Sequence, residues 1–274
     1  MKYSVVIPCY NVQDYVEVCL QSVIRASKAV SGQVEIIVVN DASTDDTRQK
    51  VEQIAHDLAQ DIPIVNINNS ENRGLAATRN IAVSHSRGSY VLLLDGDNLV
   101  HDRIFEILER ETVAHPDVDI FVLGMALIDT RGNVVGNFYG DKIRADVAAD
   151  MGAMSIPLLR GNFIDNFSLV RRDVLGERPY NEHLRALEDW DLWIRLSWIG
   201  RCRFGFIPFP MGGYRLREES LTWEMERDPK FRERVMLKIY SKILLNSKAM
   251  ALPAELYAQI TMLIRQLCAN LILS

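Results

Sequence analysis

The chain has 274 residues, a formal net charge of −5 and a hydrophobic content of 48%. This length suits one large α/β domain or a domain with a helical appendage, and the acidic balance argues against a nucleic-acid binder. The four cysteines lack paired metal-ligand spacing, which indicates free thiols in a reducing compartment. A strand begins too early for a signal peptide, and no run approaches the roughly 18 apolar residues of a membrane span. We therefore expect a cytoplasmic protein whose membrane contact would be peripheral.

The first half of the chain alternates short β-branched runs with segments of helical period. Strands are expected at residues 3–7, 34–39, 62–67 and 90–94, with a helix after each. Strands and helices that alternate at this spacing predict a mostly parallel twisted sheet flanked by helices, with right-handed crossovers.

The pattern is less regular after Pro116. A strand over residues 119–128 and a following turn predict a hairpin with residues 134–139. Residues 146–166 mix small, polar and apolar types, and we expect them to form loops over a cleft.

Glu188 begins a compact helix that should bury Leu192, Leu196 and Ile199. A strand over residues 201–207 is expected to end at Pro208-Phe209-Pro210. Beyond Asp228 the chain should be helical, with a break at Pro253.

An acidic turn, Asp95-Gly96-Asp97-Asn98, follows the apolar strand at residues 90–94. Ligand sites of open α/β sheets lie at the carboxyl ends of strands, so this turn is placed for chemistry. Two short carboxylates there would suit a hard cation such as Mg²⁺ or Mn²⁺, which commonly binds a substrate diphosphate. The alternative is a helix cap, because Asn98 and Asp102 precede a run of helical period. An Asp-x-Asp turn alone does not decide between them.

Six motifs occur along the chain in this order: Val5–Asn11, Val39–Asp45, Asn72–Asn80, Asp95–Asp97, Glu188–Trp193 and Tyr214-Arg215. Together they resemble the inverting, non-processive glycosyltransferases of family 2, which have the Rossmann-like GT-A fold. The resemblance covers roughly residues 3–222. It implies a GT-A domain over 1–225, with a nucleotide-sugar half of about 1–125 and an acceptor half of about 126–225, before a helical extension at 226–274.

The resemblance implies how the acidic residues bind a donor. Asp97 would hold Mn²⁺ or Mg²⁺, which stabilises charge on the leaving diphosphate, and Asp95 would contact the ribose or assist the metal. Asp41 would accept a hydrogen bond from the base, favouring uracil. Its alternative role is an ordinary cap before Ser43.

Three further residues are implied on the donor side. Pro8 and Tyr10 would form a wall facing the nucleotide, although a tyrosine at a strand end is often only core or rim. Arg79 would meet the base or the diphosphate as a planar cation, and its alternative role is a surface salt bridge.

Asp189 matches the catalytic base of the family. Neighbouring tryptophans could raise its pKa toward the working pH, so that it takes a proton from the acceptor hydroxyl. The alternative is that the acidic residues only favour the positive end of a helix. One base without a nucleophilic carboxylate in the motifs suggests single displacement, hence inversion. The resemblance places four more residues at the acceptor or diphosphate: Glu188, Trp190, Arg215 and Arg217.

The chain departs from the family at Arg217, where members often carry a histidine that contacts the metal. An arginine cannot ligate a cation. Either Asp97, the diphosphate and water hold the metal, or Arg215 and Arg217 supply part of the charge. The processive signature Gln-x-x-Arg-Trp is absent, which favours addition of a single sugar.

The tail has two candidate amphipathic helices. Basic and apolar residues between 230 and 248 suit either an anionic membrane surface or packing on the domain with a solvated basic face. The apolar stripe between 256 and 271 could pack internally or form a homodimer.

We therefore expect an enzyme that transfers one sugar from a nucleotide-sugar, UDP-linked, to a saccharide or lipid-linked acceptor in cell-surface polysaccharide biosynthesis. One alternative is a nucleotidyltransferase, although residues 8–11 lack its Gly-rich, lysine-containing phosphate loop. Another is a degenerate sugar-nucleotide-binding protein, which Arg217 would favour. The sequence does not name the sugar, the acceptor or the linkage, which loops at 141–166 would determine.

Overall fold

A computed structural model describes the chain except residues 59–61, 139–157, 159–161, 219, 249–251 and 274. Its first half is made of repeated strand–helix units, and three pairs of its strands are parallel. The elements are β1 Tyr3–Cys9, α1 Val16–Ser27, η1 Lys28–Val30, β2 Val34–Asn40, α2 Thr47–Asp57, β3 Ile64–Asn68, α3 Leu75–Ser84 and β4 Tyr90–Leu93.

The second part adds mixed strands to the same sheet. β6 and β9 are parallel, whereas the other new pairings are antiparallel. The elements are β5 Leu99–Val100, α4 Ile104–Ala114, β6 Ile120–Ile128, β7 Val134–Phe138, β8 Ser168–Arg171, α7 Arg172–Leu175, α8 Glu188–Trp198 and β9 Phe204–Arg215.

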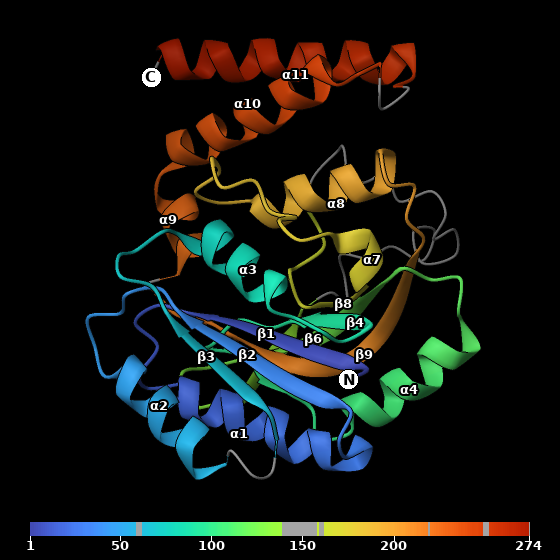
Figure 1. The fold of residues 1–274 in the computed structure, drawn as a ribbon. Helices are drawn as coiled ribbons and strands as arrows, with labels where there is room; N and C mark the ends of the chain where they lie inside the picture. Colours follow the sequence, from blue (N-terminus) through green and yellow to red (C-terminus); the bar gives the residue numbers. More distant parts are fainter. Residues whose placement is uncertain (59–61, 139–157, 159–161, 219, 249–251, 274) are drawn as a thin grey trace.

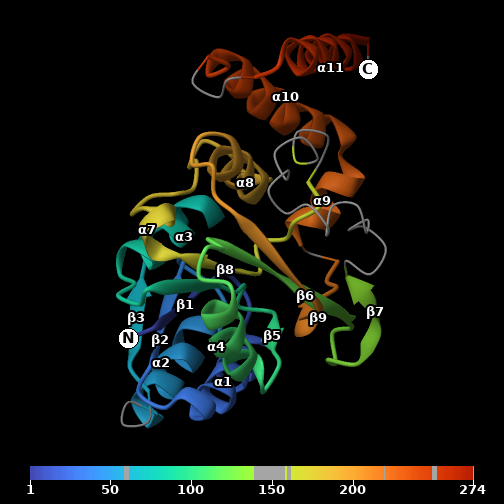
Figure 2. The ribbon, with the colours of Figure 1, turned by 90° about the vertical axis from the view of Figure 1, so that its right-hand side faces the viewer.

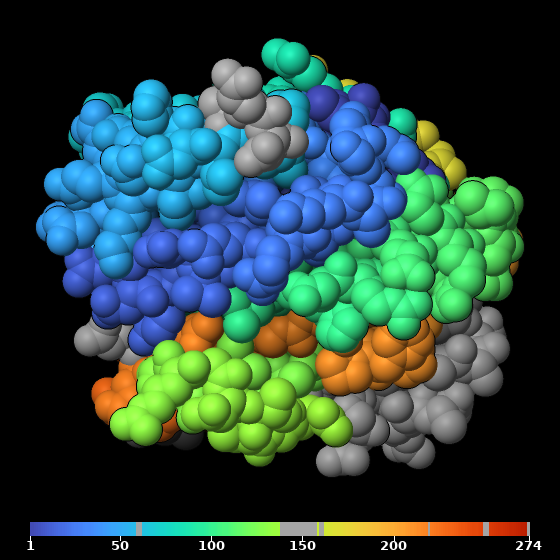
Figure 3. Space-filling model, turned by 90° about the horizontal axis from the view of Figure 1, so that it is seen from below, coloured from blue at the N-terminus to red at the C-terminus, as the bar shows by residue number. Residues whose placement is uncertain are grey.

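The strands named above form one nine-stranded sheet in the order β3-β2-β1-β4-β8-β6-β9-β5, with β7 paired to β6. Helices cover both faces (Figure 1). From below, α1, α2 and α4 cover one face, and part of β9 emerges between α4 and the β6–β7 hairpin (Figure 3). The expected α/β fold is therefore confirmed.

Alternation along each strand divides the core into two layers. Val5 and Ile7 belong to the layer under α1 and α4, whereas Val6 belongs to the layer under α3 and α8. Because both faces are covered, these strands are continuous apolar runs, which is why the sequence indicates them clearly.

Three helices complete the chain: α9 Leu221–Arg227, α10 Pro229–Leu245 and α11 Ala254–Leu273. Both ribbon views place α10 and α11 beyond α8, on the side of the sheet opposite α1 and α2 (Figures 1 and 2). Tyr240 of α10 meets Trp190 of α8 edge to face, with ring centroids 5.5 Å apart. The apolar face of α10 is buried in the same core as α8. Of the two alternatives for this helix, its apolar face therefore shows packing on the domain.

The stripe on α11 also packs within the chain. Leu256, Ile260 and Leu267 are buried, whereas Tyr257 and Met262 are exposed. Within the described ranges, no helix has the length and apolar character that crossing a bilayer demands.

The expected end of the strand at residues 208–210 is wrong, because β9 continues to Arg215. The register with β6 shifts on both sides of Gly124. A Cβ on Gly124 would lie 2.8 Å from the Phe209 carbonyl oxygen, so only a glycine lets the proline-containing backbone approach. This continuation delivers Arg215 to the site described below.

Other expectations had mixed outcomes. The hairpin of β6 and β7 is confirmed over the described residues. Ile199 is 50% exposed and lies beyond the end of α8, so its expected burial is wrong. β8 was not expected at all. The expected loops at 146–166 lie mostly outside the described residues.

Candidate active site

The carboxyl ends of β1 and β2 meet at one edge of the sheet, where Cys9 is paired in register with Asn40. The backbone N–H of Asp41 donates to the Cys9 carbonyl at 2.8 Å, and that of Gly96 donates to the Pro8 carbonyl at 3.3 Å. The segments that follow β2 and β4 therefore both contact the end of β1, and this brings Asp41 and the acidic turn to the same edge.

Gly96 allows the acidic turn to lie against β1. A Cβ at this position would be 2.7 Å from Cys9 Sγ and 3.1 Å from the Pro8 carbonyl oxygen. Asn98 is buried, and its Oδ1 accepts from the backbone N–H of Arg215 at 2.9 Å. The helix-cap alternative for this turn is wrong, because the N-cap of α4 is Arg103 and makes no side-chain cap.

Asp41 organises the turn before α3. Its Oδ1 accepts from Asn69 Nδ2 at 2.7 Å and from the Arg73 N–H at 2.9 Å, and its Oδ2 accepts from the Gly74 N–H at 2.9 Å. The alternative role before Ser43 is wrong, because Asn40 Oδ1 accepts from the Ser43 N–H instead. Asp41 is therefore a buried anchor of the Arg73–Gly74 turn.

The two residues expected as a nucleotide-facing wall differ in exposure. Pro8 is buried inside β1, whereas Tyr10 is 47% exposed just beyond the end of the strand. Of the pair, Tyr10 presents its ring to the surface, so its alternative role as a core residue is wrong.

Arg79 of α3 bridges the two halves of the chain. Its guanidinium binds Asp95 Oδ1 at 2.6 Å and also pairs with Glu188 Oε1. Arg79 is only 2% exposed, so the alternative of a surface salt bridge is wrong. Both partners hold the guanidinium within the protein, so Arg79 would act on a donor through Asp95.

Arg215 fastens the acidic turn to the β6–β7 hairpin. Its Nε donates to the Asp97 carbonyl at 2.8 Å, and its Nη1 donates to the carbonyls of Asp129 and Thr130 at 2.9 and 3.0 Å. The residue is 5% exposed. Three backbone carbonyls therefore engage its guanidinium, and a contact of Arg215 with acceptor or diphosphate stays a prediction.

Arg217 pairs with the second carboxylate of the turn. Its Nε lies 2.8 Å from Asp97 Oδ2, and the side chains are 18% and 15% exposed. Burial raises the pKa of Asp97, and the positive charge of Arg217 opposes this shift. Tyr15, at the start of α1, lies beneath both arginines, with the Arg215 and Arg217 guanidinium carbons 4.7 and 5.5 Å from its ring centroid.

The first turn of α8 carries the Glu-Asp-Trp motif. The helix begins after Leu187, whose φ of 57° is left-handed, and acidic residues favour the positive end of its dipole. Trp190 is 1% exposed and donates from Nε1 to the Leu158 carbonyl at 2.7 Å. Trp190 lies in the core and Glu188 is buried against Arg79, and a contact of either residue with acceptor or diphosphate stays a prediction.

Asp189 is partly exposed, unlike its two neighbours. Its Oδ1 accepts from the Trp190 N–H at 2.7 Å, and both oxygens lie 3.3 Å from Asn162 Nδ2. Burial, together with the negative charges of Glu188 and Asp165, raises the pKa of Asp189 to about 8. A carboxyl group with this pKa can accept a proton near neutral pH.

Asp165 is a site residue that the sequence did not reveal. It lies shortly before β8, and its Oδ1 accepts from the Phe167 N–H at 2.9 Å. Burial and the charge of Asp95 raise the pKa of Asp165 to about 7. Because Asp165 interacts with Asp95, Asp97 and Asp189, it joins the acidic turn to the start of α8. We call Asp95, Asp97, Asp165, Glu188 and Asp189 the acidic cluster.

A family model described as glycosyl transferase family 2 matches residues 4–178. The chain belongs to this family. The match begins at Ser4 in β1 and includes the other strands of the parallel half and the acidic turn.

Two curated relatives show how far the family likeness extends. The chain is 31% identical over 209 residues to the succinoglycan biosynthesis protein ExoU of Rhizobium meliloti, covering 70% of this chain and 55% of that protein. It is 30% identical over 152 residues to glycosyltransferase GlyA of Streptococcus pneumoniae, covering 54% of this chain and 21% of that protein. The chain therefore spans between about a fifth and about half of these relatives.

Solved structures of glycosyltransferases share the fold. S. aureus TarS 1–349 in complex with UDP-GlcNAc has a TM-score of 0.67 at 18% identity, covering 98% of this chain and 72% of that one. Mannosyltransferase PcManGT of Pyrobaculum calidifontis in complex with GDP-Man and Mn²⁺ has a TM-score of 0.62 at 18% identity, covering 98% and 73%. The expected GT-A fold is confirmed.

The Mn²⁺ of that second neighbour is consistent with divalent metal use in this fold. In this glycosyltransferase, however, the residues do not fit a resident cation. Asp95 and Asp97 are each paired with an arginine. Across the part of the chain that the structure describes, no three His, Cys, Asp or Glu side chains are grouped as metal ligands.

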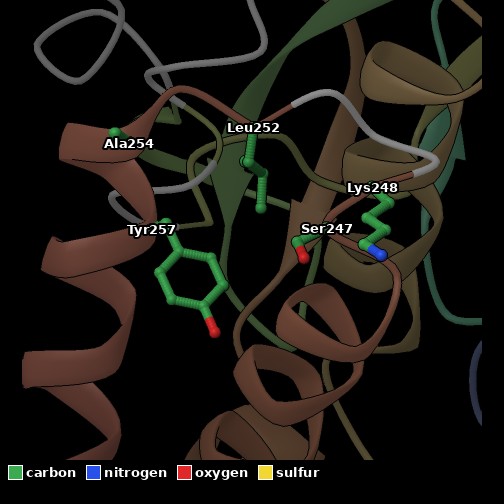
Figure 4. Close-up of a pocket in the computed structure, with 5 residues that line it drawn as sticks. All are labelled: Ser247, Lys248, Leu252, Ala254 and Tyr257. Atoms are coloured by element: carbon green, nitrogen blue, oxygen red, sulfur yellow. The ribbon is translucent and has the colours of Figure 1, made fainter.

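A pocket elsewhere in this family 2 enzyme lies at the connection between α10 and α11 (Figure 4). The lining residues are Ser247, Lys248, Leu252, Ala254 and Tyr257.

Proposed function

We propose that the enzyme transfers a single sugar, with inversion, from a UDP-sugar to a saccharide or lipid-linked acceptor in cell-surface polysaccharide biosynthesis. The observation that carries the proposal is Asp189, a partly exposed carboxyl group in the acidic cluster with a pKa raised to about 8. The succinoglycan biosynthesis role in the name of ExoU supports the pathway class.

Asp189 takes the proton of the acceptor hydroxyl, whose oxygen then attacks the anomeric carbon of the donor. The bond from this carbon to the diphosphate oxygen breaks, and its electron pair leaves with the nucleoside diphosphate. The mechanism uses one carboxylate as a base and no second carboxylate as a nucleophile. The anomeric carbon therefore undergoes a single displacement, and its configuration inverts.

Asp41 and Tyr10 would receive the nucleoside. Asp41 Oδ2 has one described donor, the Gly74 N–H, and a carboxylate oxygen can accept a second hydrogen bond. The N–H of uracil fits that position, and TarS is known in complex with UDP and UDP-GlcNAc. A preference for a guanine nucleotide, the kind bound in PcManGT with GDP-Man, would overturn the assignment of uracil to Asp41.

We assign residues 1–125 to donor binding, 126–225 to acceptor binding and 226–274 to a helical extension. Buried thiols at Cys9 and Cys19 suit a reducing compartment, so we place the enzyme in the cytoplasm. The enzyme would meet a lipid-linked acceptor at the inner face of the membrane.

Release of UDP or GDP from a panel of nucleotide-sugars, with acceptor saccharides, tests the proposal. Asp189→Asn should lower transfer by about 10²–10⁴-fold while leaving UDP affinity unchanged. Asp102→Asn, at an exposed carboxylate outside the acidic cluster, is the control and should transfer normally. Full transfer by Asp189→Asn would exclude Asp189 as the base. UDP binding without turnover of any donor would favour the binding-protein alternative.

A further inference from the structure

The acidic turn is neutralised by the chain itself. Asp95 lies 2.6 Å from an Arg79 nitrogen, and Asp97 lies 2.8 Å from Arg217 Nε. Arg79 also pairs with Glu188, and Arg215 donates to the backbone carbonyl of Asp97 at 2.8 Å. A divalent cation that entered the turn would therefore meet a guanidinium group beside each of its two carboxylates.

Two of the three arginines are fixed by several partners. Arg79 is engaged by two carboxylates and is 2% exposed. Arg215 is engaged by three backbone carbonyls, and its burial lowers its own pKa. Moving the Arg79 guanidinium would leave the buried Glu188 carboxylate without its partner, and moving that of Arg215 would break three partly buried hydrogen bonds.

Arg217 is bound differently. Its carboxylate partner is Asp97, and its buried Nε makes no hydrogen bond of proper geometry despite the 2.8 Å separation. Its guanidinium also lies 5.5 Å from the Tyr15 ring centroid, on the ring that Arg215 shares. A cation held by one ion pair and one aromatic face can exchange its anion without unpairing a network.

We propose that Arg217 takes the place of a divalent cation, exchanging Asp97 for the β-phosphate of the donor, so that donor binding and transfer need no metal. The proposal rests on the proposed function, in which the donor is a nucleoside diphosphate sugar. As the anomeric carbon–oxygen bond breaks, negative charge grows on the phosphate oxygen, and Arg217 N–H groups donate to that oxygen. The planar guanidinium can bind two phosphate oxygens at once.

Calorimetric titration with UDP, in EDTA and then in excess Mn²⁺, tells phosphate binding by Arg217 apart from phosphate binding through a cation on Asp97. We expect UDP to bind equally well in both. Arg217→Gln should weaken binding by about 10- to 100-fold. Asp97→Asn should leave binding unchanged or tighter, because it removes the carboxylate that competes with phosphate. A cation held by Asp97 predicts the opposite result for Asp97→Asn.

Arg217→His is the converse variant. It places an imidazole beside Asp97, and we expect UDP binding that Mn²⁺ strengthens and EDTA weakens. Arg103→Gln, at an exposed arginine that precedes α4 and pairs with Glu106, is the matched control and should bind UDP as the wild type does. Thermal melting of each variant shows that it is folded.

Binding that requires Mn²⁺ in the wild type, or that Asp97→Asn abolishes, overturns the role of Arg217 but leaves the transferase function intact. Absence of UDP and GDP binding in EDTA and in Mn²⁺ overturns both proposals.

Discussion

Replacement of Arg79 by methionine removes the buried cation that joins Asp95 to Glu188. Breaking a buried ion pair typically costs about 3–5 kcal/mol, because the remaining charges stay buried without a partner. Glu188 is 6% exposed and Asp95 is 28% exposed, so water reaches part of the site. We therefore expect the lower end, a loss of about 3 kcal/mol in the free energy of unfolding at neutral pH.

Denaturant unfolding measures this loss, and Arg171→Met is the matched control. Arg171 also bridges two carboxylates, Asp119 and Asp173, but it is 31% exposed. Water screens its ion pairs, so we expect a loss below about 1 kcal/mol. Equal losses in the two variants would refute the reasoning.

The raised pKa of Asp189 predicts a transfer rate that rises with pH and levels off above about 8; a flat profile from about 6 to about 9 would contradict its role as base. The pKa of Asp165, raised to about 7, means that the folded chain keeps a proton that the unfolded chain loses, so native stability falls from about pH 4 to about pH 7. Asp165→Asn should remove this fall and be the more stable form above pH 7; unfolding curves with an unchanged pH dependence would exclude this. Gly96→Ala would place a Cβ 2.7 Å from Cys9 Sγ, so melting should show a loss of about 1–3 kcal/mol. Gly136→Ala meets only Leu127 at 3.4 Å and should melt as wild type, and equal melting of both variants would contradict the close approach.

The sequence indicates the parallel half of the sheet well, because strands covered on both faces need uninterrupted apolar residues. It failed at β9, where Pro208 and Pro210 suggested an end. The strand continues because Gly124, on another strand, leaves room for that backbone. No local pattern carries this information.

The candidate site was likewise predictable from the sequence only in part. The order and spacing of the motifs indicated Asp95, Asp97 and Asp189 together. The arginine partners could not be foreseen, since Arg79 and Glu188 are 109 positions apart. Asp165 belongs to none of the motifs and lies in a segment of mixed polar and apolar residues, and only the fold brings it to the acidic cluster.

The contact between Trp190 and Tyr240 bears on how this enzyme can be trimmed or grafted. Trp190 adjoins the proposed base in sequence, and α10 covers its indole. A truncation after Arg227 would expose that ring and the apolar surface around it. The exposed surface would promote aggregation, and α8, which carries Asp189, would be less stable. Chimeras that exchange acceptor preference should therefore take α8, α10 and α11 from the same parent protein.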